Sequence, residues 1–474
     1  MLTKLALPKG RLLDGTAALL NRAGWGLSDY HRGGRSYHLE SNRFPDLAVK
    51  VFHEKDIPIQ VAVGNYDLGI CGWDWIEELL VRYPRSALVK LKGLGYGKSM
   101  LFMAASSSRG SSVFARMQTK GNAVRIASEH PSLAESFAVR LRLRRFSIFP
   151  VWGAAGVYPP ESADLALISV RDEEELAEYE LVPVSEILTS SALLIANRNS
   201  WESKDMRRIL ISIYDSLAAD DRSTPTAGAA RMLPATVQRP AELATRDTVW
   251  VALPDGHQQQ PTVELLTRAG IEVGDYPSSS GNRRPAINLS GVRVKVIRPQ
   301  DMPLQVANGS FDLAITGRDW LREHLYQFPS SPVEELLNLN FGRVKIVAVV
   351  SNHMVADDIA SLRQLNREGS APFRVASEYV NMADRYAREH HLGWYRVVPT
   401  WGASEGFLPD DADLLIENTQ TGRTLSRHNL KIIDRLFEST ACLIGNKTAA
   451  SSASKRKRIG SIIATLQAAV EGIN

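Results

Sequence analysis

The sequence has few of the features that mark secreted, membrane or nucleic-acid-binding proteins. Its 474 residues include only two cysteines, Cys71 and Cys442, which support neither a disulfide framework nor a thiolate metal site. No apolar run reaches the ~18 residues of a membrane span, and the N-terminus lacks the apolar core of a signal peptide. The 56 Lys and Arg nearly balance the 52 Asp and Glu, so the net charge of +4 creates no strong field for nucleic acid. A cytoplasmic protein without membrane or nucleic-acid partners is expected.

The chain does contain two copies of one sequence unit. The segment Arg125–Ala138 ("RIASEHPSLAESFA") matches Arg374–Ala387 ("RVASEYVNMADRYA") at an offset of 249 positions. Nearer the N-terminus, Asp56–Trp75 matches Asp301–Trp320 at an offset of 245 positions. A repeat of this length, continued through most of the chain, indicates a tandem duplication of one folding unit.

Within each copy, short apolar runs alternate with segments of helical spacing. Runs such as "DLGIC" and "DLALI" have the length of strands, whereas "DWIEELLVRY" has the period of a helix. This alternation is typical of α/β folds with largely parallel sheets. The sequence predicts two modules, 1–217 and 249–474, joined by an Ala-, Thr- and Pro-rich linker at 218–248. Ligands of such sheets bind beyond the carboxyl ends of the strands, so the loops at those ends are the candidate sites.

One strand-end loop of the second copy has the composition of a phosphate site. Thr421, Gly422, Arg423 and Thr424 follow the apolar run "DLLIE". Two hydroxyls, a glycine that lets backbone N–H groups approach and an arginine that grips two oxygens suit a phosphate monoester. The preceding Glu417 is suited to accept hydrogen bonds from sugar hydroxyls. An ordinary turn with a solvent-exposed arginine and a solvated carboxylate is the alternative.

The first copy carries acids at the matching place. Its segment Ile168–Leu176 ("ISVRDEEEL") aligns with Glu417–Leu425 ("ENTQTGRTL"), and Asp172, Glu173 and Glu174 stand where the phosphate loop is expected. These carboxylates would repel a phosphate dianion near neutral pH. The sequence therefore predicts a solvated, charged helix start here and no phosphate site, with a magnesium cluster as the less favoured alternative.

The N-terminal loop shows the opposite asymmetry. In "LPKGRL", Lys9 and Arg11 flank a glycine where a strand passes into a helix, which suits a polyanion. The second copy reads "LPDGHQ", with Asp255 and His257 at those positions. Each copy thus keeps a different half of an anion site, unless Lys9 and Arg11 are plain surface charges.

Together these motifs resemble the catalytic module of ATP phosphoribosyltransferase, the first enzyme of histidine biosynthesis. The resemblance is carried by "ALPKGRLL", "DIPIQVAVGNYDLGICGWD" and "LGYGKSMLFMA" in the first copy and by "ADLLIENTQTGRTL" and "STACLIGN" in the second. It implies two tandem bilobed α/β modules like type II periplasmic binding proteins, with the active site between lobes. It also implies transfer of the phosphoribosyl group from phosphoribosyl pyrophosphate to N1 of the adenine of ATP, with Mg²⁺ as cofactor and no assigned protein ligand for the metal.

The resemblance also implies roles for individual residues. Glu405 in "WGASEGF" matches a glutamate that precedes the family's phosphate loop, and Arg423 departs from the small residue usual at its position. Arg298 in "VIRPQDMP" matches an arginine thought to help across the dimer interface toward the departing pyrophosphate. The substrate-binding candidates are Glu405, Glu417, Thr421, Gly422, Arg423 and Thr424, and the catalytic candidates are Lys9, Arg11 and Arg298.

Partners and the division of labour between copies stay open at this stage. Short forms of the family need a regulatory subunit that resembles histidyl-tRNA synthetase, so a partner of that kind, or further oligomerisation, is compatible with the resemblance. In one arrangement the second copy works, supported by basic groups of the first across a pseudo-dimer interface within one chain. In another, each half contributes one loop to a composite cleft. In the third, both sites are impaired and the chain is a non-catalytic, nucleotide- or anion-binding regulatory paralogue.

Overall fold

The computed structural model describes residues 2–108, 123–217, 247–278, 281–447 and 452–472. By their contacts these residues form two compact units. The first unit holds the described residues of Met1–Pro150, Asp164–Val237 and Thr400–Phe407, and the second holds those of Val151–Ala163, Gln238–Pro399 and Leu408–Asn474. The linker predicted at 218–248 lies, except for its last two residues, outside the described part of the chain.

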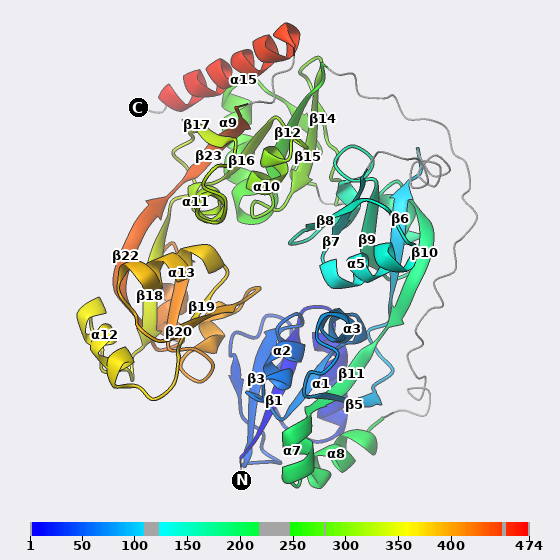
Figure 1. Cartoon of the computed structure of the whole chain (residues 1–474), viewed down its shortest axis with the longest axis vertical. Helices are drawn as coiled ribbons and strands as arrows, with labels where there is room; N and C mark the ends of the chain where they lie inside the picture. Colours follow the sequence, from blue (N-terminus) through cyan, green and yellow to red (C-terminus); the bar gives the residue numbers. More distant parts are fainter. Residues whose placement is uncertain (1, 109–122, 218–246, 279–280, 448–451, 473–474) are drawn as a thin grey trace. The chain divides into compact units, whose positions relative to one another are not determined.

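The first unit contains two sheets, one for each lobe (Figure 1). The first sheet has the order β2-β3-β1-β4-β11-β5 and the second β10-β6-β9-β7-β8. The strands are β1 (Thr3–Lys9), β2 (His38–Leu39), β3 (Leu47–His53), β4 (Leu68–Gly72), β5 (Leu88–Gly93), β6 (Ser99–Ser106), β7 (Val124–Ser128), β8 (Phe146–Pro150), β9 (Leu165–Val170), β10 (Leu181–Ser190) and β11 (Ala192–Asn197). The helices are α1 (Leu13–Arg22), α2 (Ile57–Ala62), α3 (Trp73–Arg82), α5 (Pro131–Arg140), α6 (Glu175–Glu178), α7 (Arg198–Ser203) and α8 (Arg207–Tyr214).

The second unit repeats this plan. Its main sheets have the orders β15-β12-β16-β23-β17 and β20-β19-β21-β18-β22, and β13 pairs with β14. The strands are β12 (Val249–Pro254), β13 (Val273–Gly274), β14 (Ala286–Ile287), β15 (Val292–Ile297), β16 (Leu313–Gly317), β17 (Val333–Asn338), β18 (Val344–Ser351), β19 (Phe373–Ser377), β20 (Tyr395–Pro399), β21 (Leu414–Thr419), β22 (Leu430–Ser439) and β23 (Ala441–Asn446). The helices are α9 (Gln259–Arg268), α10 (Met302–Ala307), α11 (Arg318–Gln327), α12 (Ile359–Glu368), α13 (Val380–Glu389), α14 (Arg423–Arg427) and α15 (Ala453–Glu471).

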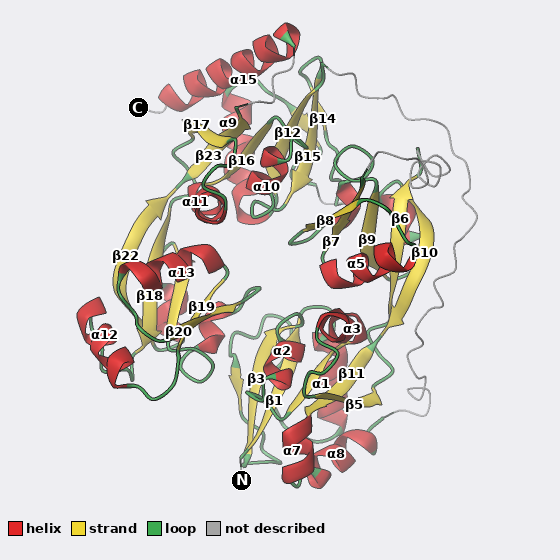
Figure 2. Ribbon diagram, in the orientation of Figure 1, coloured by secondary structure: helices red, strands yellow, loops and turns green. Residues whose placement is uncertain are grey.

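In both units the central strands run parallel because helices carry the chain back between them. Strand β1 pairs in parallel with β3 and β4, and β12 does the same with β15 and β16. The chain enters the second lobe at β6 or β18 and returns along β10 or β22, so that β11 and β23 lie antiparallel to β4 and β16. Figure 2 shows the helices packed around these sheets. The predicted α/β fold is confirmed, with two main sheets in each of two units.

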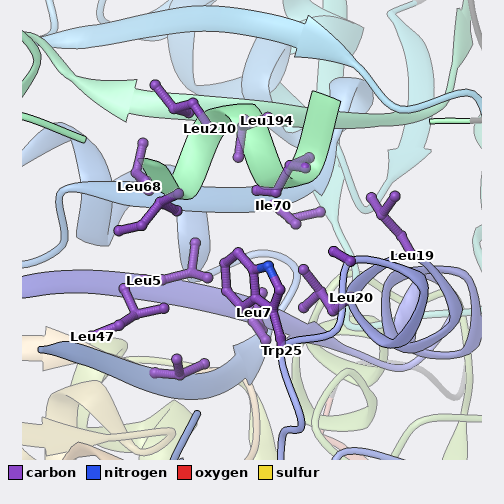
Figure 3. Packing of buried hydrophobic residues seen from close by; sticks show 14 of the residues in the cluster. Leu5, Leu7, Leu19, Leu20, Trp25, Leu47, Leu68, Ile70, Leu194 and Leu210 are labelled. Carbon is purple, nitrogen blue, oxygen red and sulfur yellow. The ribbon is translucent and has the colours of Figure 1, made fainter. Parts of the chain in front are cut away.

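An apolar core fixes the first lobe of the first unit. Leu5 and Leu7 of β1 point into it beside Trp25, and Leu20 of α1 covers the indole ring (Figure 3). The Trp25 side chain is fully buried, and its Nε1 donates a hydrogen bond to Ser212 Oγ of α8 at 3.0 Å. Burying an aromatic side chain of this size removes ~150–250 Å² from water. The carboxyl ends of β1, β3 and β4 are therefore held on a rigid support.

Each unit also includes one segment that belongs, by sequence, to the other copy. Residues Val151–Ala163 pack with the second unit, and residues Thr400–Phe407 pack with the first. In the second unit, the backbone N–H of Trp152 donates to the Asp301 carboxylate at 3.0 Å, and the Trp152 ring meets that of Trp320 at 5.7 Å between centroids. The two copies are therefore not separable folding units along the sequence.

Candidate functional site

The loop after β21 turns at a glycine in the left-handed conformation. Gly422, the residue before α14, has φ of 71°, and its N–H donates to Thr419 Oγ1 at 3.0 Å. Nothing lies within 4 Å of a Cβ added at Gly422, so a larger side chain would fit. Glycine is favoured here because of its positive φ, which other residues rarely adopt. Thr421, Arg423 and Thr424 are exposed around it. The turn thus presents two hydroxyls and a guanidinium to solvent.

Glu417 lies at the base of this loop. It is buried on β21, and its Oε1 accepts hydrogen bonds from the backbone N–H and Nδ2 of Asn418 at 2.9 and 3.0 Å. Among the residues that the structure describes, Arg423 takes part in no ion pair. The site therefore combines a fixed carboxylate with an exposed cation whose charge is available to a ligand.

The matching loop of the first copy is closed by its own acids. The Asp172 carboxylate accepts from the backbone N–H of Glu175 at 3.0 Å, at the start of α6. The Glu175 carboxylate in turn accepts from the backbone N–H and Nε of Arg171 at 2.7 and 3.2 Å. Glu173, the counterpart of Gly422, does not adopt a positive φ. The predicted charged helix start is confirmed, and carboxylates take the hydrogen-bond donors that a phosphate would need.

Lys9 and Arg11 differ sharply in their surroundings. Lys9 is exposed at the end of β1, with its Nζ 5.4 Å from the centre of the Tyr37 ring. Arg11 donates to Ser99 Oγ and to the carboxylates of Glu54 and Asp74, both at 3.2 Å. The two carboxylates are only 6% and 2% exposed, against 32% for the Arg11 side chain. Lys9 is therefore the available cation of this loop, whereas the charge of Arg11 is already compensated.

The electrostatics of this cluster support the same conclusion. Burial by itself would lower the pKa of Arg11, but Asp74 and Glu54 outweigh it and raise that pKa above its ordinary value. Burial also raises the pKa of Glu54. Sequence reasoning did not single out Glu54. A signal was present in the repeat, because Arg11 and Glu54 change together between the copies, to His257 and Pro299.

Glu405 lies with the first unit, unlike the other candidates of the second copy. Its neighbour Gly406 packs against Tyr37, where an added Cβ would come within 3.0 Å of Cγ. The Phe407 ring meets the Phe52 ring edge to face at 5.3 Å between centroids. The structure thus brings the segment of Glu405 to the strand β3 and to Tyr37, over which Lys9 lies. The phosphate loop and Glu417 belong to the second unit.

Arg298 follows β15 in the second unit and is partly paired. Its guanidinium lies 3.4 Å from Asp255, which also binds Arg283 at 2.6 Å. A Cβ added to Gly153 would lie 3.1 Å from Arg298 Nε, so this arginine borders the segment 151–163. Burial would raise the pKa of Asp255, but Arg283 and Arg298 together lower it. The loop that replaces Lys9 in the second copy is therefore a paired acidic loop.

A sequence profile of the family described as "HisG: ATP phosphoribosyltransferase" matches residues 53–218 and again residues 298–468. The chain belongs to the ATP phosphoribosyltransferase family. The double match confirms that the family's sequence is present as a tandem duplication.

Individual relatives match about half of this chain. An ATP phosphoribosyltransferase of Saccharolobus solfataricus is 37% identical over 202 residues, which cover 42% of this chain and 64% of the relative. One from Solibacter usitatus is 32% identical over 225 residues, 47% of this chain and 73% of the relative. The match thus spans less than two thirds of the Saccharolobus protein.

Solved structures also match about half of this chain. An ATP phosphoribosyl transferase (HisG:HisZ) complex from Thermotoga maritima is 21% identical, with a TM-score of 0.39, over 48% of this chain and all of that one. The periplasmic aliphatic sulphonate binding protein SsuA of Escherichia coli is 14% identical, with a TM-score of 0.30, over 47% of this chain and 72% of that one.

Two searches of the described residues bear on cofactors and location. No helix there has both the length and the apolar character needed to cross a membrane. Within the same residues, no group of three or more His, Cys, Asp and Glu side chains is arranged to hold a metal ion. The acidic loop at Asp172 therefore does not form such a cluster with its neighbours.

Replacing Gly422 by alanine tests the turn that characterises the second copy. A Cβ at φ of 71° costs about 1–2 kcal/mol, and the loop is expected to relax away from this conformation. If the loop binds an anion, the affinity for inorganic phosphate, measured by calorimetry, should fall about tenfold in this variant. Gly256→Ala is the matched control, because Gly256 has φ of 78° and equally open surroundings but lies on the loop after β12. A similar fall in both variants would contradict the role of the Gly422 turn.

Proposed function

We propose that the chain is an ATP phosphoribosyltransferase whose working phosphate site is the Gly422 loop of the second copy. One observation carries the proposal. The loop after β21 keeps a left-handed glycine, exposed hydroxyls and an available Arg423, whereas the loop after β9 is capped by its own Asp172. The family match supports the reaction, and this asymmetry supports the choice between the copies.

The proposed transfer needs positioning more than a protein nucleophile. The adenine N1 of ATP forms a bond to C1 of the ribose while the bond from C1 to pyrophosphate breaks, and the pyrophosphate departs with the bonding electron pair. The transition state has oxocarbenium character, so a fixed carboxylate near the ribose and cations near the leaving group lower its free energy. In this proposal Thr421, Gly422, Arg423 and Thr424 hold the 5-phosphate, and Glu417 orients the ribose hydroxyls.

The remaining candidates are proposed to act on the pyrophosphate. Lys9 is exposed at the end of β1, so its charge is available to an anion. Arg11 is paired with Glu54 and Asp74, so its guanidinium has a fixed position but attracts an anion less strongly than an unpaired cation would. Arg298 keeps only a 3.4 Å pairing with Asp255.

Mg²⁺ is part of the proposal as a partner of the substrate phosphates. Magnesium usually keeps several waters and binds through one or two carboxylates plus substrate phosphates, so a cluster of protein ligands is not required. Glu417, which precedes the Gly422 loop on β21, is a candidate carboxylate for such a site. When bound, the ion would neutralise charge on the pyrophosphate.

The alternative is a non-catalytic regulatory paralogue that binds nucleotides or anions. Two features of the first copy favour this regulatory alternative. The charge of Arg11 is neutralised by Glu54 and Asp74, and Asp172 closes the loop that would otherwise bind phosphate. A cytoplasmic location and a regulatory subunit resembling histidyl-tRNA synthetase belong to the proposal through the family resemblance.

An assay on the purified full chain distinguishes a catalytic chain from a non-catalytic regulatory one. With ATP, phosphoribosyl pyrophosphate and Mg²⁺ supplied, formation of phosphoribosyl-ATP is followed by its ultraviolet absorbance, first on the chain alone and then with a histidyl-tRNA-synthetase-like subunit added. Turnover in either case supports the enzyme. Binding of phosphoribosyl pyrophosphate by calorimetry without turnover in both cases would favour the regulatory paralogue.

A further inference from the structure

A buried tyrosine lies between the two lobes of the second module. Tyr379 directly precedes α13, and its side chain is fully buried. Its hydroxyl donates to Asp319 Oδ2 at 2.6 Å and accepts from Asn418 Nδ2 at 3.1 Å. The Tyr379 ring also lies against Trp320, with 4.4 Å between the ring centroids. The hydroxyl and the ring are therefore both fixed.

Asp319 fixes one end of this chain of hydrogen bonds. It lies in the first turn of α11, directly after β16 of the first lobe's sheet. Its Oδ1 accepts a hydrogen bond from Ser439 Oγ at 2.6 Å, and its backbone N–H donates to Ser439 Oγ at 3.0 Å. Ser439 ends β22, the strand by which the chain returns to the first lobe. Asp319 is thus anchored where the lobes join.

Asn418 carries the other end to Glu417. The amide Nδ2 that donates to Tyr379 also donates to Glu417 Oε1 at 3.0 Å, and the backbone N–H of Asn418 donates to the same oxygen at 2.9 Å. Because one nitrogen contacts both groups, the orientation of the Asn418 amide links the Tyr379 hydroxyl to the Glu417 carboxylate. The four residues Asp319, Tyr379, Asn418 and Glu417 are called the interlobe relay below.

The first copy has lost this relay. The position of Tyr379 is taken by His130, which is buried and stacked on Trp75 at 4.0 Å between centroids. Among the described residues, neither ring nitrogen of His130 finds a hydrogen-bond partner, and its Nε2 lies 3.9 Å from Asp74, beyond hydrogen-bond distance. Ser169 and Ile168 replace the last two members of the relay. The relay is therefore present in the copy that keeps the phosphate loop and absent from the other.

We propose that Tyr379 is a positioning residue that acts through Asn418 to hold the Glu417 carboxylate toward the ribose hydroxyls of phosphoribosyl pyrophosphate. The inference rests on the proposed function and deepens it, since it ties the sugar contact to the junction between the lobes. Tyr379 itself does not touch the substrate. The hydrogen bonds of the interlobe relay thus connect Asp319 at the lobe junction to Glu417, the proposed ribose contact.

Tyr379→Phe is the direct test, because it removes only the hydroxyl. The KM for phosphoribosyl pyrophosphate is expected to rise about tenfold, the worth of one hydrogen bond to a charged group. The KM for ATP is expected to change less than about twofold, since the proposal gives the relay a role toward the ribose of phosphoribosyl pyrophosphate alone. His130→Phe is the matched control in the first copy and should leave both constants unchanged. Equal effects of Tyr379→Phe on both constants would overturn the inference.

A double-mutant cycle separates this role from general stabilisation of the fold. In a Glu417→Ala background, Tyr379→Phe should raise the KM for phosphoribosyl pyrophosphate no further, because the carboxylate that it positions is gone. Additive increases would mean that Tyr379 acts by another route and would overturn the inference. A purely structural role would give such additivity.

The inference and the proposed function fail in different ways. If the wild-type chain neither binds phosphoribosyl pyrophosphate nor forms product with a regulatory subunit added, the proposed function fails, and the role of Tyr379 toward that substrate fails with it. If the wild type is active but the cycle is additive, only the relay is wrong. A double-mutant cycle of Tyr379→Phe and Asn418→Ala, followed by thermal unfolding, tests the hydrogen bond between these two side chains. The shifts in Tm are expected to be non-additive, and additive shifts would contradict the relay.

Discussion

Replacing Arg423 by glutamate is expected to lower kcat/KM for phosphoribosyl pyrophosphate by about 10²-fold, because a hydrogen bond to a charged group contributes about 1.5–3 kcal/mol to binding. The reversal also places a carboxylate beside the 5-phosphate, where like charges repel. Because Arg423 is exposed and unpaired among the described residues, the fold should tolerate the change. Steady-state kinetics over a range of phosphoribosyl pyrophosphate concentrations measures the effect, and thermal unfolding checks that the variant is folded.

The duplicated chain supplies its own control for this prediction. Glu174 occupies the position of Arg423 in the first copy, on the loop that Asp172 closes. Glu174→Ala should change kcat/KM less than about twofold, since no phosphate is expected to bind there. Comparable losses from Glu174→Ala and Arg423→Glu would remove the assignment of the working site to the second copy.

The largest effect on stability is expected at Glu161. Lys295 is only 1% exposed, and its Nζ binds Glu161 at 2.5 Å and the backbone oxygen of Val157 at 2.9 Å. Arg284 adds a second contact to the same carboxylate at 3.2 Å. Glu161→Gln removes the negative charge that both the buried Lys295 ammonium and Arg284 contact, and should lower the free energy of unfolding of the second unit by about 3 kcal/mol. Denaturant unfolding followed by tryptophan fluorescence measures this change.

A surface pair provides the comparison for Glu161. Glu175 pairs with Arg171, whose side chain is 76% exposed, so Glu175→Gln should cost less than about 1 kcal/mol. A loss at Glu161 no larger than that at Glu175 would show that Lys295 is stabilised in another way, for example by the carbonyl oxygen of Val157.

The same carboxylate predicts a pH dependence with a definite sign. Burial alone would raise the pKa of Glu161, but Lys295 and Arg284 lower it below its ordinary value near 4.5. A group with a depressed pKa in the folded state stabilises the fold above its unfolded pKa, and this contribution is lost as the pH falls through the folded value. The stability difference between wild type and Glu161→Gln should therefore be largest near neutral pH and shrink below pH 4.5.

The sequence predicted the α/β modules and the places of the strand-end loops because these depend on local patterns, and it revealed the duplication through the match between distant segments. The alternation of apolar runs and the glycine of "TGRT" are visible within a few residues, and β21, α14 and the left-handed Gly422 lie where they indicate. The charge of a loop is likewise local, which is why the difference between Asp172 and Thr421 could be interpreted before the structure was known.

The sequence did not predict the contacts that join distant residues. Arg11 lies 43 positions from Glu54 and 63 from Asp74, and Tyr379 lies 60 from Asp319. Nothing in the spacing of these residues reveals that they meet, because their approach depends on how strands and helices pack. The comparison of the two copies contained part of this information, since Arg11 changes together with Glu54, and Tyr379 together with Asn418.

The burial of Lys295 against a carboxylate from residues 151–163 restricts how this gene can be rearranged. A chimera that replaces residues 1–217 with another member of the family inherits Lys295 but not necessarily an acid at the place of Glu161. Without that acid, the buried ammonium loses the carboxylate that it contacts at 2.5 Å. Swaps between such proteins should succeed only when the incoming half carries an acidic residue there, or when Lys295 is exchanged for an apolar side chain in the same step.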